Sequence, residues 1–196
     1  MSSTKHLDPL LAVLQDLQGW MNASETAFVI IGGVAASLLG RPRFTQDVDV
    51  TVVVDPSKWE QFLASSRQFG FEGRLPNVLQ FATLNRVLLI RHVSSGINVD
   101  IVLGALPFEE QVVLRAQPMA IGTITIPLPT PEDLVIMKAI AHRPRDAEDI
   151  GAVLALHPDL DRRRVLRWVR DFAKVLDSPE FLVDLQAALG RHPRRP

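Results

Sequence analysis

Residues 27–54 read AFVIIGGVAASLLGRPRFTQDVDVTVVV, and the order of residue types in this stretch indicates the fold. Its first five residues are apolar and mostly β-branched, which predicts a buried strand. The glycine pair Gly32-Gly33 ends that strand, and a short helix is expected over 34–39. The valine-rich segment 47–54 predicts a second strand. Strands that alternate with helices in this way are typical of a mixed α/β domain.

The rest of the sequence predicts a mixture of strands and helices before residue 130 and only helices after it. Helical spacing and hairpin signals place the further expected elements at 9–21, 56–69, 87–103, 107–115 and 119–126. We therefore expect an α/β (α+β) fold, with a mixed sheet flanked by helices. Its core, with an N-terminal helix, would cover 1–130, and a helical C-terminal part packed on the core would cover 131–196.

The composition limits the function classes. The 196 residues are 47% hydrophobic and carry a net charge of −1, which fits a folded domain rather than a strongly basic nucleic-acid binder. The sequence has no cysteine, which excludes disulfides and cysteine-ligated zinc. No targeting segment and no membrane-spanning run is recognisable. These features predict a soluble, cytoplasmic protein.

Two carboxylates stand at alternate positions of the second expected strand. Asp47 and Asp49 would point to the same face, because side chains two residues apart share a face of a strand. At about 6–7 Å apart they would repel by roughly 2–3 kcal/mol at an effective dielectric constant near 20. A cation between them would remove that repulsion, and oxygen ligands favour Mg²⁺ or Mn²⁺. The bland alternative is a solvated edge paired with Arg41 and Arg43.

A third carboxylate and a glycine pair complete the candidate site. Asp100 is the lone charge in an apolar strand, and such a charge is costly unless it is paired or metal-bound. It would join Asp47 and Asp49 if its strand lies beside theirs. Gly32 and Gly33 would let a phosphate approach the backbone at a helix start. The structural alternatives are a turn cap at Asp100 and a simple turn at the glycines.

This constellation resembles the signature of the DNA polymerase β-like nucleotidyltransferases: Ile31-Gly32-Gly33, thirteen residues, Asp47-Val48-Asp49, and a later Asp100. The resemblance implies a nucleotidyltransferase fold and the transfer of a nucleotide monophosphate from an NTP to an acceptor. It implies that the glycines hold the nucleotide phosphates and that the paired acids bind Mg²⁺ or Mn²⁺. The third acid would complete the metal site or act as base. Gly33 stands where many members have serine.

A closer resemblance is to bacterial minimal nucleotidyltransferases, including the toxins of type IV abortive-infection toxin–antitoxin systems. It rests on Arg43-Phe44-Thr45, on Lys138 and on the segment 146–150. It implies nucleotide-binding roles for Arg43, Thr45, Lys138 and Asp146, and it would bring an antitoxin partner. The alternative to an enzyme is a weak or inactive nucleotidyltransferase-like module that acts through a partner. Lys138 and Asp146 could equally be a solvated lysine and a helix cap.

The acceptor is left open by these motifs. It could be RNA, a protein hydroxyl or a small molecule, and the toxin-like resemblance favours RNA, with tRNA first. Arg163, Arg167 and Arg170 would share one face of a helix, where they could contact an RNA backbone or form a solvated surface. The basic tail with Arg191, Arg194 and Arg195 would add to that charge.

Overall fold

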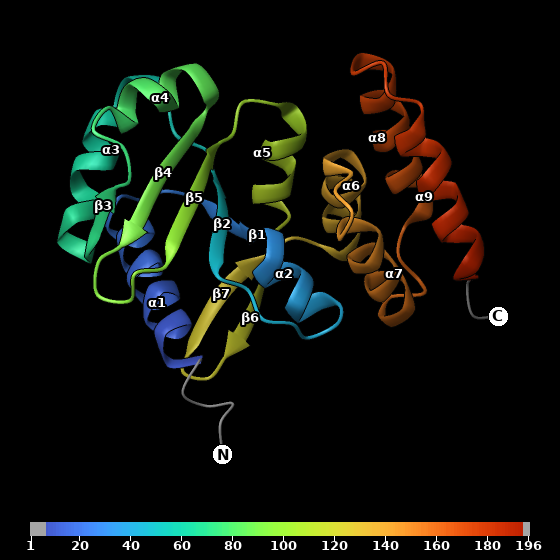
Figure 1. Ribbon diagram of the computed structural model, residues 1–196, viewed down its shortest axis with the longest axis horizontal. Helices are drawn as coiled ribbons and strands as arrows, with labels where there is room; N and C mark the ends of the chain where they lie inside the picture. Colours follow the sequence, from blue (N-terminus) through green and yellow to red (C-terminus); the bar gives the residue numbers. More distant parts are fainter. Residues whose placement is uncertain (1–6, 194–196) are drawn as a thin grey trace. The chain divides into compact units, whose positions relative to one another are not determined.

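The computed structural model describes residues 7–193 of the chain (Figure 1). Arg194 and Arg195 of the predicted basic tail lie outside the described residues. The chain forms two compact units. The first contains residues 7–33 and 45–128, and the second contains residues 34–44 and 129–193. The sequence pattern changes near residue 130, but it gives no sign that segment 34–44 belongs to the second unit.

The first unit is built on a mixed five-stranded sheet. Strand β2 pairs in parallel with β5, and every other neighbouring pair in this sheet is antiparallel. A separate two-stranded hairpin follows. In sheet order the strands are β1 (Phe28–Ile31), β2 (Asp47–Val52), β5 (Asn98–Leu103), β4 (Val87–His92) and β3 (Phe71–Gly73), and the hairpin is β6 (Gln117–Ile121) with β7 (Ile124–Leu128).

One face of the sheet is buried because its strands alternate. Val48 and Val50 of β2 and Ile101 of β5 are fully buried, whereas the aspartates between them point to the other face. Helix α1 (Leu7–Ala23) contributes Trp20 to the core, and its ring stacks on Phe62 of α3 (Trp59–Ser66) at 4.4 Å between centroids. Full burial of a large apolar side chain contributes about 1.5–3 kcal/mol. The burial of Val48 and Val50 confirms the expectation that Asp47 and Asp49 share the opposite face of β2.

Several elements differ in extent from the sequence prediction. Helix α2 (Gly32–Leu39) begins at the glycine pair, which was expected to precede it. The expected helix 56–69 is a short α-helix between two 3₁₀ turns, η2 (Pro56–Lys58) and η3 (Arg67–Phe69). Strand β3 and helix α4 (Val78–Asn85) were not predicted. Three residues ending in glycine are too few to show alternation, and α4 is only eight residues long.

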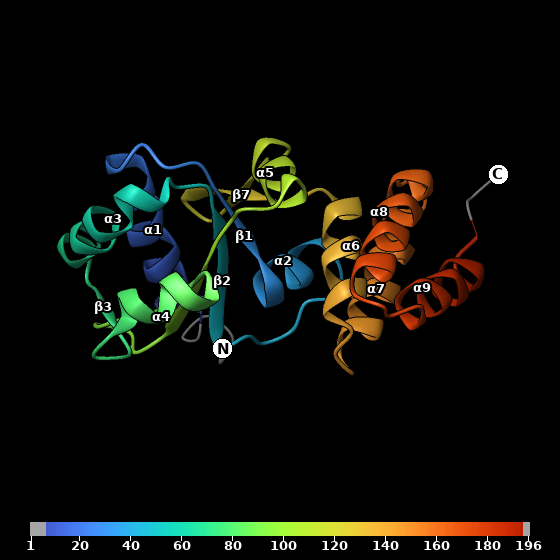
Figure 2. The same ribbon diagram turned by 90° about the horizontal axis from the view of Figure 1, so that it is seen from above.

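The second unit is helical, as predicted for the region after residue 130. Figure 2 shows its four longest helices, coloured from orange to red. They end shortly before prolines, which disfavour a helix interior: Pro144, Pro158, Pro179 and Pro193. In chain order they are α6 (Pro131–Ala141), α7 (Asp146–Leu156), α8 (Arg162–Val175) and α9 (Glu180–Arg191).

Side-chain caps start two of these helices. The hydroxyl of Thr130 accepts a hydrogen bond from the backbone N–H of Asp133 at 3.2 Å, which caps the start of α6. The carboxylate of Asp161 accepts from two N–H groups of α8. No helix within residues 7–193 is long and apolar enough to cross a bilayer.

A buried ion pair joins α6 to α8. The Asp133 side chain is fully buried, and its carboxylate accepts from Arg164 at 2.8 and 3.0 Å. Segment 34–44 is fastened to the same unit by His157, whose Nε2 donates to the carbonyl of Leu39 at 2.9 Å. Polar contacts of the second unit therefore hold α6 against α8 and also hold segment 34–44 in place.

We predict that Asp133→Ala lowers the free energy of unfolding by about 3–5 kcal/mol, because it leaves the Arg164 charge buried without its carboxylate. Urea denaturation followed by circular dichroism measures the change. The control is Glu72→Gln, which breaks the exposed Glu72–Arg91 pair of the first unit and should cost less than about 1 kcal/mol. Similar losses in both variants would contradict the structural role of the buried pair.

Candidate functional site

Three aspartates of the first unit, Asp47, Asp49 and Asp100, lie on the sheet face that is opposite the core. Asp49 of β2 lies directly opposite Asp100 of β5 in the parallel ladder. Asp47 precedes Asp49 by two residues on the same face and lies opposite Asn98. The prediction that the strand of Asp100 lies beside that of Asp47 and Asp49 is confirmed. The three carboxylates therefore share one face at the start of two neighbouring strands.

The first glycine of the pair is required by the carboxylate beside it. Gly32 has a φ of +61°, which L side chains rarely adopt. A Cβ atom added there would lie 1.9 Å from Oδ2 of Asp49. Any other residue would therefore displace the carboxylate as well as strain the backbone. The phosphate-binding role of Gly32 and Gly33 stays a prediction, and this contact is a second reason for the first glycine.

An arginine that the sequence analysis missed engages the third carboxylate. Nη2 of Arg74 forms an ion pair with Oδ1 of Asp100, and both side chains are partly exposed, at 26% and 37%. Burial raises the pKa of Asp100, Arg74 lowers it, and the negative charges of Asp49 and Asp47 raise it, with a net upward shift. The three carboxylates are thus close enough to influence one another.

The donor set suits a hard divalent cation. It consists of carboxylate oxygens, which Mg²⁺ and Mn²⁺ prefer, and Asp47, Asp49 and Asp100 would hold the ion. Within residues 7–193, however, no group of three acidic, histidine or cysteine side chains is arranged closely enough to hold a metal as it stands. The Asp100 carboxylate is instead turned to Arg74. Binding of a metal by all three acids therefore requires a rearrangement at Asp100.

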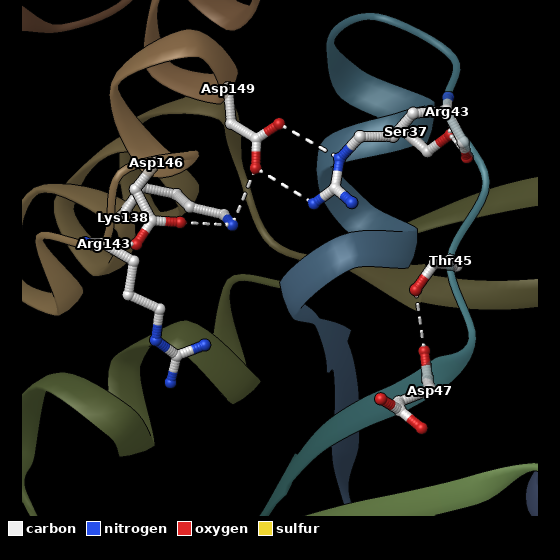
Figure 3. A network of polar contacts seen from close by, with 8 residues as sticks. All are labelled: Ser37, Arg43, Thr45, Asp47, Lys138, Arg143, Asp146 and Asp149. Atoms are coloured by element: carbon white, nitrogen blue, oxygen red, sulfur yellow. Dashed lines mark hydrogen bonds and ion pairs between the residues drawn. The ribbon is translucent and has the colours of Figure 1, made fainter.

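Three of the other predicted site residues form a network in the second unit (Figure 3). Nζ of Lys138 lies 2.7 Å from Asp146 and 2.8 Å from Asp149. Arg43 contacts Asp149 with two nitrogens, each at 3.2 Å, and Asp146 also accepts from the backbone N–H of Arg143 at 3.0 Å. Lys138 is 9% exposed, so it is not the solvated lysine of the bland alternative.

Asp149 is the centre of this network, and it was not among the predicted site residues. Its burial raises its pKa, but the hydrogen bonds and positive charges of Lys138 and Arg43 outweigh that effect, so the net pKa is lowered. The Asp-x-x-Asp spacing of 146 and 149 was the sequence signal, because residues three apart share a helix face. In the structure both aspartates form ion pairs with positively charged side chains of the protein.

The Arg-x-Thr motif is divided between the two units. Arg43 belongs to the second unit, and its side chain pairs with Asp149 instead of Asp47 or Asp49. Thr45 belongs to the first unit, where its hydroxyl donates to the carbonyl of Asp47 at 3.0 Å. Thr45 thereby holds the backbone at the start of β2.

The arginines of α8 fall into two groups. Arg162 donates to backbone carbonyls near the end of α9, and Arg164 binds Asp133. Arg163, Arg167 and Arg170 are exposed, as the sequence predicts for one helix face. Lys174 is also exposed and continues the same face one turn on, which the sequence analysis did not note.

The family of the chain is indicated by a family model described as "Nucleotidyltransferase of unknown function (DUF6036)", which matches residues 8–176. This match covers more than half of the chain. No curated protein matches the sequence significantly.

Solved structures similar in fold include two that share most of their length with this chain. An antigenic nucleotidyltransferase-like protein from Paracoccidioides brasiliensis is 18% identical, with a TM-score of 0.55 over 96% of this chain and 95% of that one. The antibiotic-resistance factor ANT(2'')-Ia is 14% identical, with a TM-score of 0.59 over 92% of this chain and 97% of that one. At these identities the likeness concerns the fold alone, and it confirms the expected nucleotidyltransferase fold.

We predict that the lowered pKa of Asp149 makes the second unit sensitive to acid. A carboxyl group whose folded pKa lies below its ordinary value of 3.8 stabilises the protein above that pH, and the stabilisation is lost as the pH falls through the folded pKa. Urea titration from pH 6 downward measures the free energy of unfolding. This free energy should decrease once the pH is lower than about 4.

Asp149→Asn should reduce this loss, because asparagine does not titrate. Asp171→Asn on the exposed surface of α8 is the control and should leave the pH profile unchanged. A profile for Asp149→Asn as steep as that of the unsubstituted protein would mean that the acid sensitivity arises elsewhere.

Proposed function

The chain belongs to the DUF6036 family of nucleotidyltransferases, and we propose that it is a Mg²⁺- or Mn²⁺-dependent enzyme that transfers a nucleotide monophosphate from an NTP. One observation supports this most directly. The parallel register of β2 and β5 sets Asp49 opposite Asp100, with Asp47 on the same face. Three converging carboxylates beside the tight turn at Gly32 are what a metal–triphosphate site requires.

The proposed reaction is a displacement at the α-phosphorus. An acceptor hydroxyl oxygen forms a bond to the α-phosphorus, the bond to the β-phosphate breaks, and pyrophosphate leaves. The metal would neutralise the charge that develops on the phosphate oxygens. Asp47 and Asp49 would bind it. Asp100 would either complete that site, with solvent taking the proton of the attacking hydroxyl, or accept that proton itself.

The glycine turn would receive the triphosphate. Backbone N–H groups at the start of α2 could donate to phosphate oxygens. Nucleotide contacts by Arg43, Thr45, Lys138 and Asp146 stay predictions. In the structure each of these four side chains is engaged within its own unit. Their roles there are to fix the segment before β2 and the start of α7.

For the acceptor we favour RNA, with tRNA first, over a protein or a small molecule. The support is the exposed basic face of α8, formed by Arg163, Arg167, Arg170 and Lys174. Regularly spaced cations on one helix face suit a phosphate backbone. The resemblance of the Arg-x-Thr and lysine motifs to the toxins of type IV abortive-infection systems points the same way. An antitoxin partner would follow from that resemblance.

We predict that the double variant Asp47→Ala, Asp49→Ala loses transfer of label from labelled NTPs to total RNA by more than about a hundredfold, because it removes two metal ligands. Mg²⁺ with NTP should raise the melting temperature of the unsubstituted protein but not that of the variant. Glu60→Ala, Glu110→Ala removes the same charge from exposed positions and should retain both properties.

Two results would count against this function. An equal melting shift in the aspartate variant would place the metal elsewhere. NTP binding without transfer to RNA, protein or small molecules would support the inactive binding module that acts through a partner.

We predict that reversing Arg163, Arg167 and Arg170 to Glu weakens RNA binding and flattens the dependence of log affinity on log salt by about two, since each single-strand phosphate contact contributes about −0.7. Filter binding or fluorescence anisotropy between about 50 and 300 mM salt measures this slope. Reversal of Lys58, Arg67 and Arg91, exposed in the first unit, is the matched control. An unchanged slope and transfer rate would favour a small-molecule acceptor.

A further inference from the structure

The position of Arg74 is fixed by the sheet. Its backbone N–H donates to the carbonyl of Leu89 at 2.9 Å, which continues the antiparallel pairing of β3 with β4 by one residue. Leu89 lies opposite Asp100 on the next strand. The row across this face therefore runs Ile31, Asp49, Asp100, Leu89 and Arg74. The guanidinium reaches over Leu89 to Asp100, and the backbone holds it within that reach.

The charges on this face explain why an arginine is held there. Asp47, Asp49 and Asp100 repel one another, and the first two raise the pKa of the third. Arg74 contributes the positive charge at Asp100. A divalent cation at the same carboxylate would meet the guanidinium at close range, and two cations repel. The carboxylate oxygens of Asp100 therefore cannot bind Arg74 and a divalent cation equally well at the same time.

The guanidinium is also incompletely bonded where it lies. Its Nε is buried, and in the part of the chain that the structure describes it has no hydrogen-bond acceptor. A buried donor without an acceptor is unfavourable. Phosphate oxygens are the partners that match an arginine fork, because two parallel N–H groups can donate to them. A triphosphate brought to the glycine turn would offer such acceptors.

We propose that Arg74 is a positioning residue that competes with the metal for Asp100 and leaves it for the phosphates of the incoming NTP. The metal alone binds weakly, because it must displace Arg74 without offering the arginine another anion. The metal and the nucleotide then bind cooperatively, because each removes an obstacle to the other. This inference rests on the proposed function, since it takes Asp100 as part of the metal site.

The test is the affinity for Mn²⁺ alone, measured by electron paramagnetic resonance of the free ion or by calorimetry on the full chain. Arg74→Gln should bind Mn²⁺ at least about tenfold more tightly than the unsubstituted protein, because a competing charge has gone. A non-hydrolysable NTP analogue should increase the Mn²⁺ affinity of the unsubstituted protein by a larger factor than that of Arg74→Gln.

The matched control is Arg91→Gln. Arg91 lies two residues from Leu89 on the same strand and face, and it pairs with Glu72 rather than with the site. It should leave Mn²⁺ affinity unchanged within about twofold, since exposed charges are well screened. Adding Asp100→Asn to Arg74→Gln should abolish the gain, which assigns the gain to Asp100. Melting temperatures check that each variant is folded.

Two outcomes overturn the inference, and they differ in what else they affect. If Mn²⁺ binds and its affinity is the same in the unsubstituted protein and Arg74→Gln, Arg74 does not compete for the metal, and the proposed function stands. If Mn²⁺ binds to none of the proteins, with or without the analogue, the metal site itself is wrong, and the proposed function falls with the inference.

Discussion

The parallel pairing of β2 with β5 is the constraint on which the candidate site depends. It sets Asp49 opposite Asp100, and because a tight turn cannot join parallel neighbours, a long excursion of the chain must separate the two strands. That excursion, residues 53–97, contains α3, α4, β3 and β4. It therefore also delivers Arg74 to the same face. The parallel pairing of β2 with β5 thus accounts for the position of Asp49 and Asp100 and for the connection that carries Arg74.

The environments of Asp149 in the second unit and Asp100 in the first are opposite in charge. In the second unit Asp149 receives Lys138 and a two-nitrogen contact from Arg43, and its pKa is lowered. In the first unit Asp100 has Arg74 on one side and two further carboxylates on the other, and its pKa is raised. Acids that are saturated by cations stabilise a structure. Asp100 has two further carboxylates as neighbours, and this contrast separates the two sets of aspartates.

Much of the fold followed from local pattern. The valine-rich run predicted β2, and the hairpin signals predicted the strands within 87–103. The convergence of Asp49 and Asp100 needed only that their strands be neighbours. The contact of Arg43 with Asp149 was not predictable, because it joins residues 106 apart and depends on packing rather than period. Arg74 was missed for a related reason, since it follows a three-residue strand that has no pattern of its own.

Segment 34–44 gives the chain an interleaved order, because it leaves the first unit after Gly33 and the first unit resumes at Thr45. A fragment that stops near residue 128 would carry this segment without the partners of Leu39 and Arg43, which are His157 and Asp149. A fragment that starts at residue 129 would lack it altogether. Neither unit is thus a continuous stretch of chain that a single truncation could isolate intact.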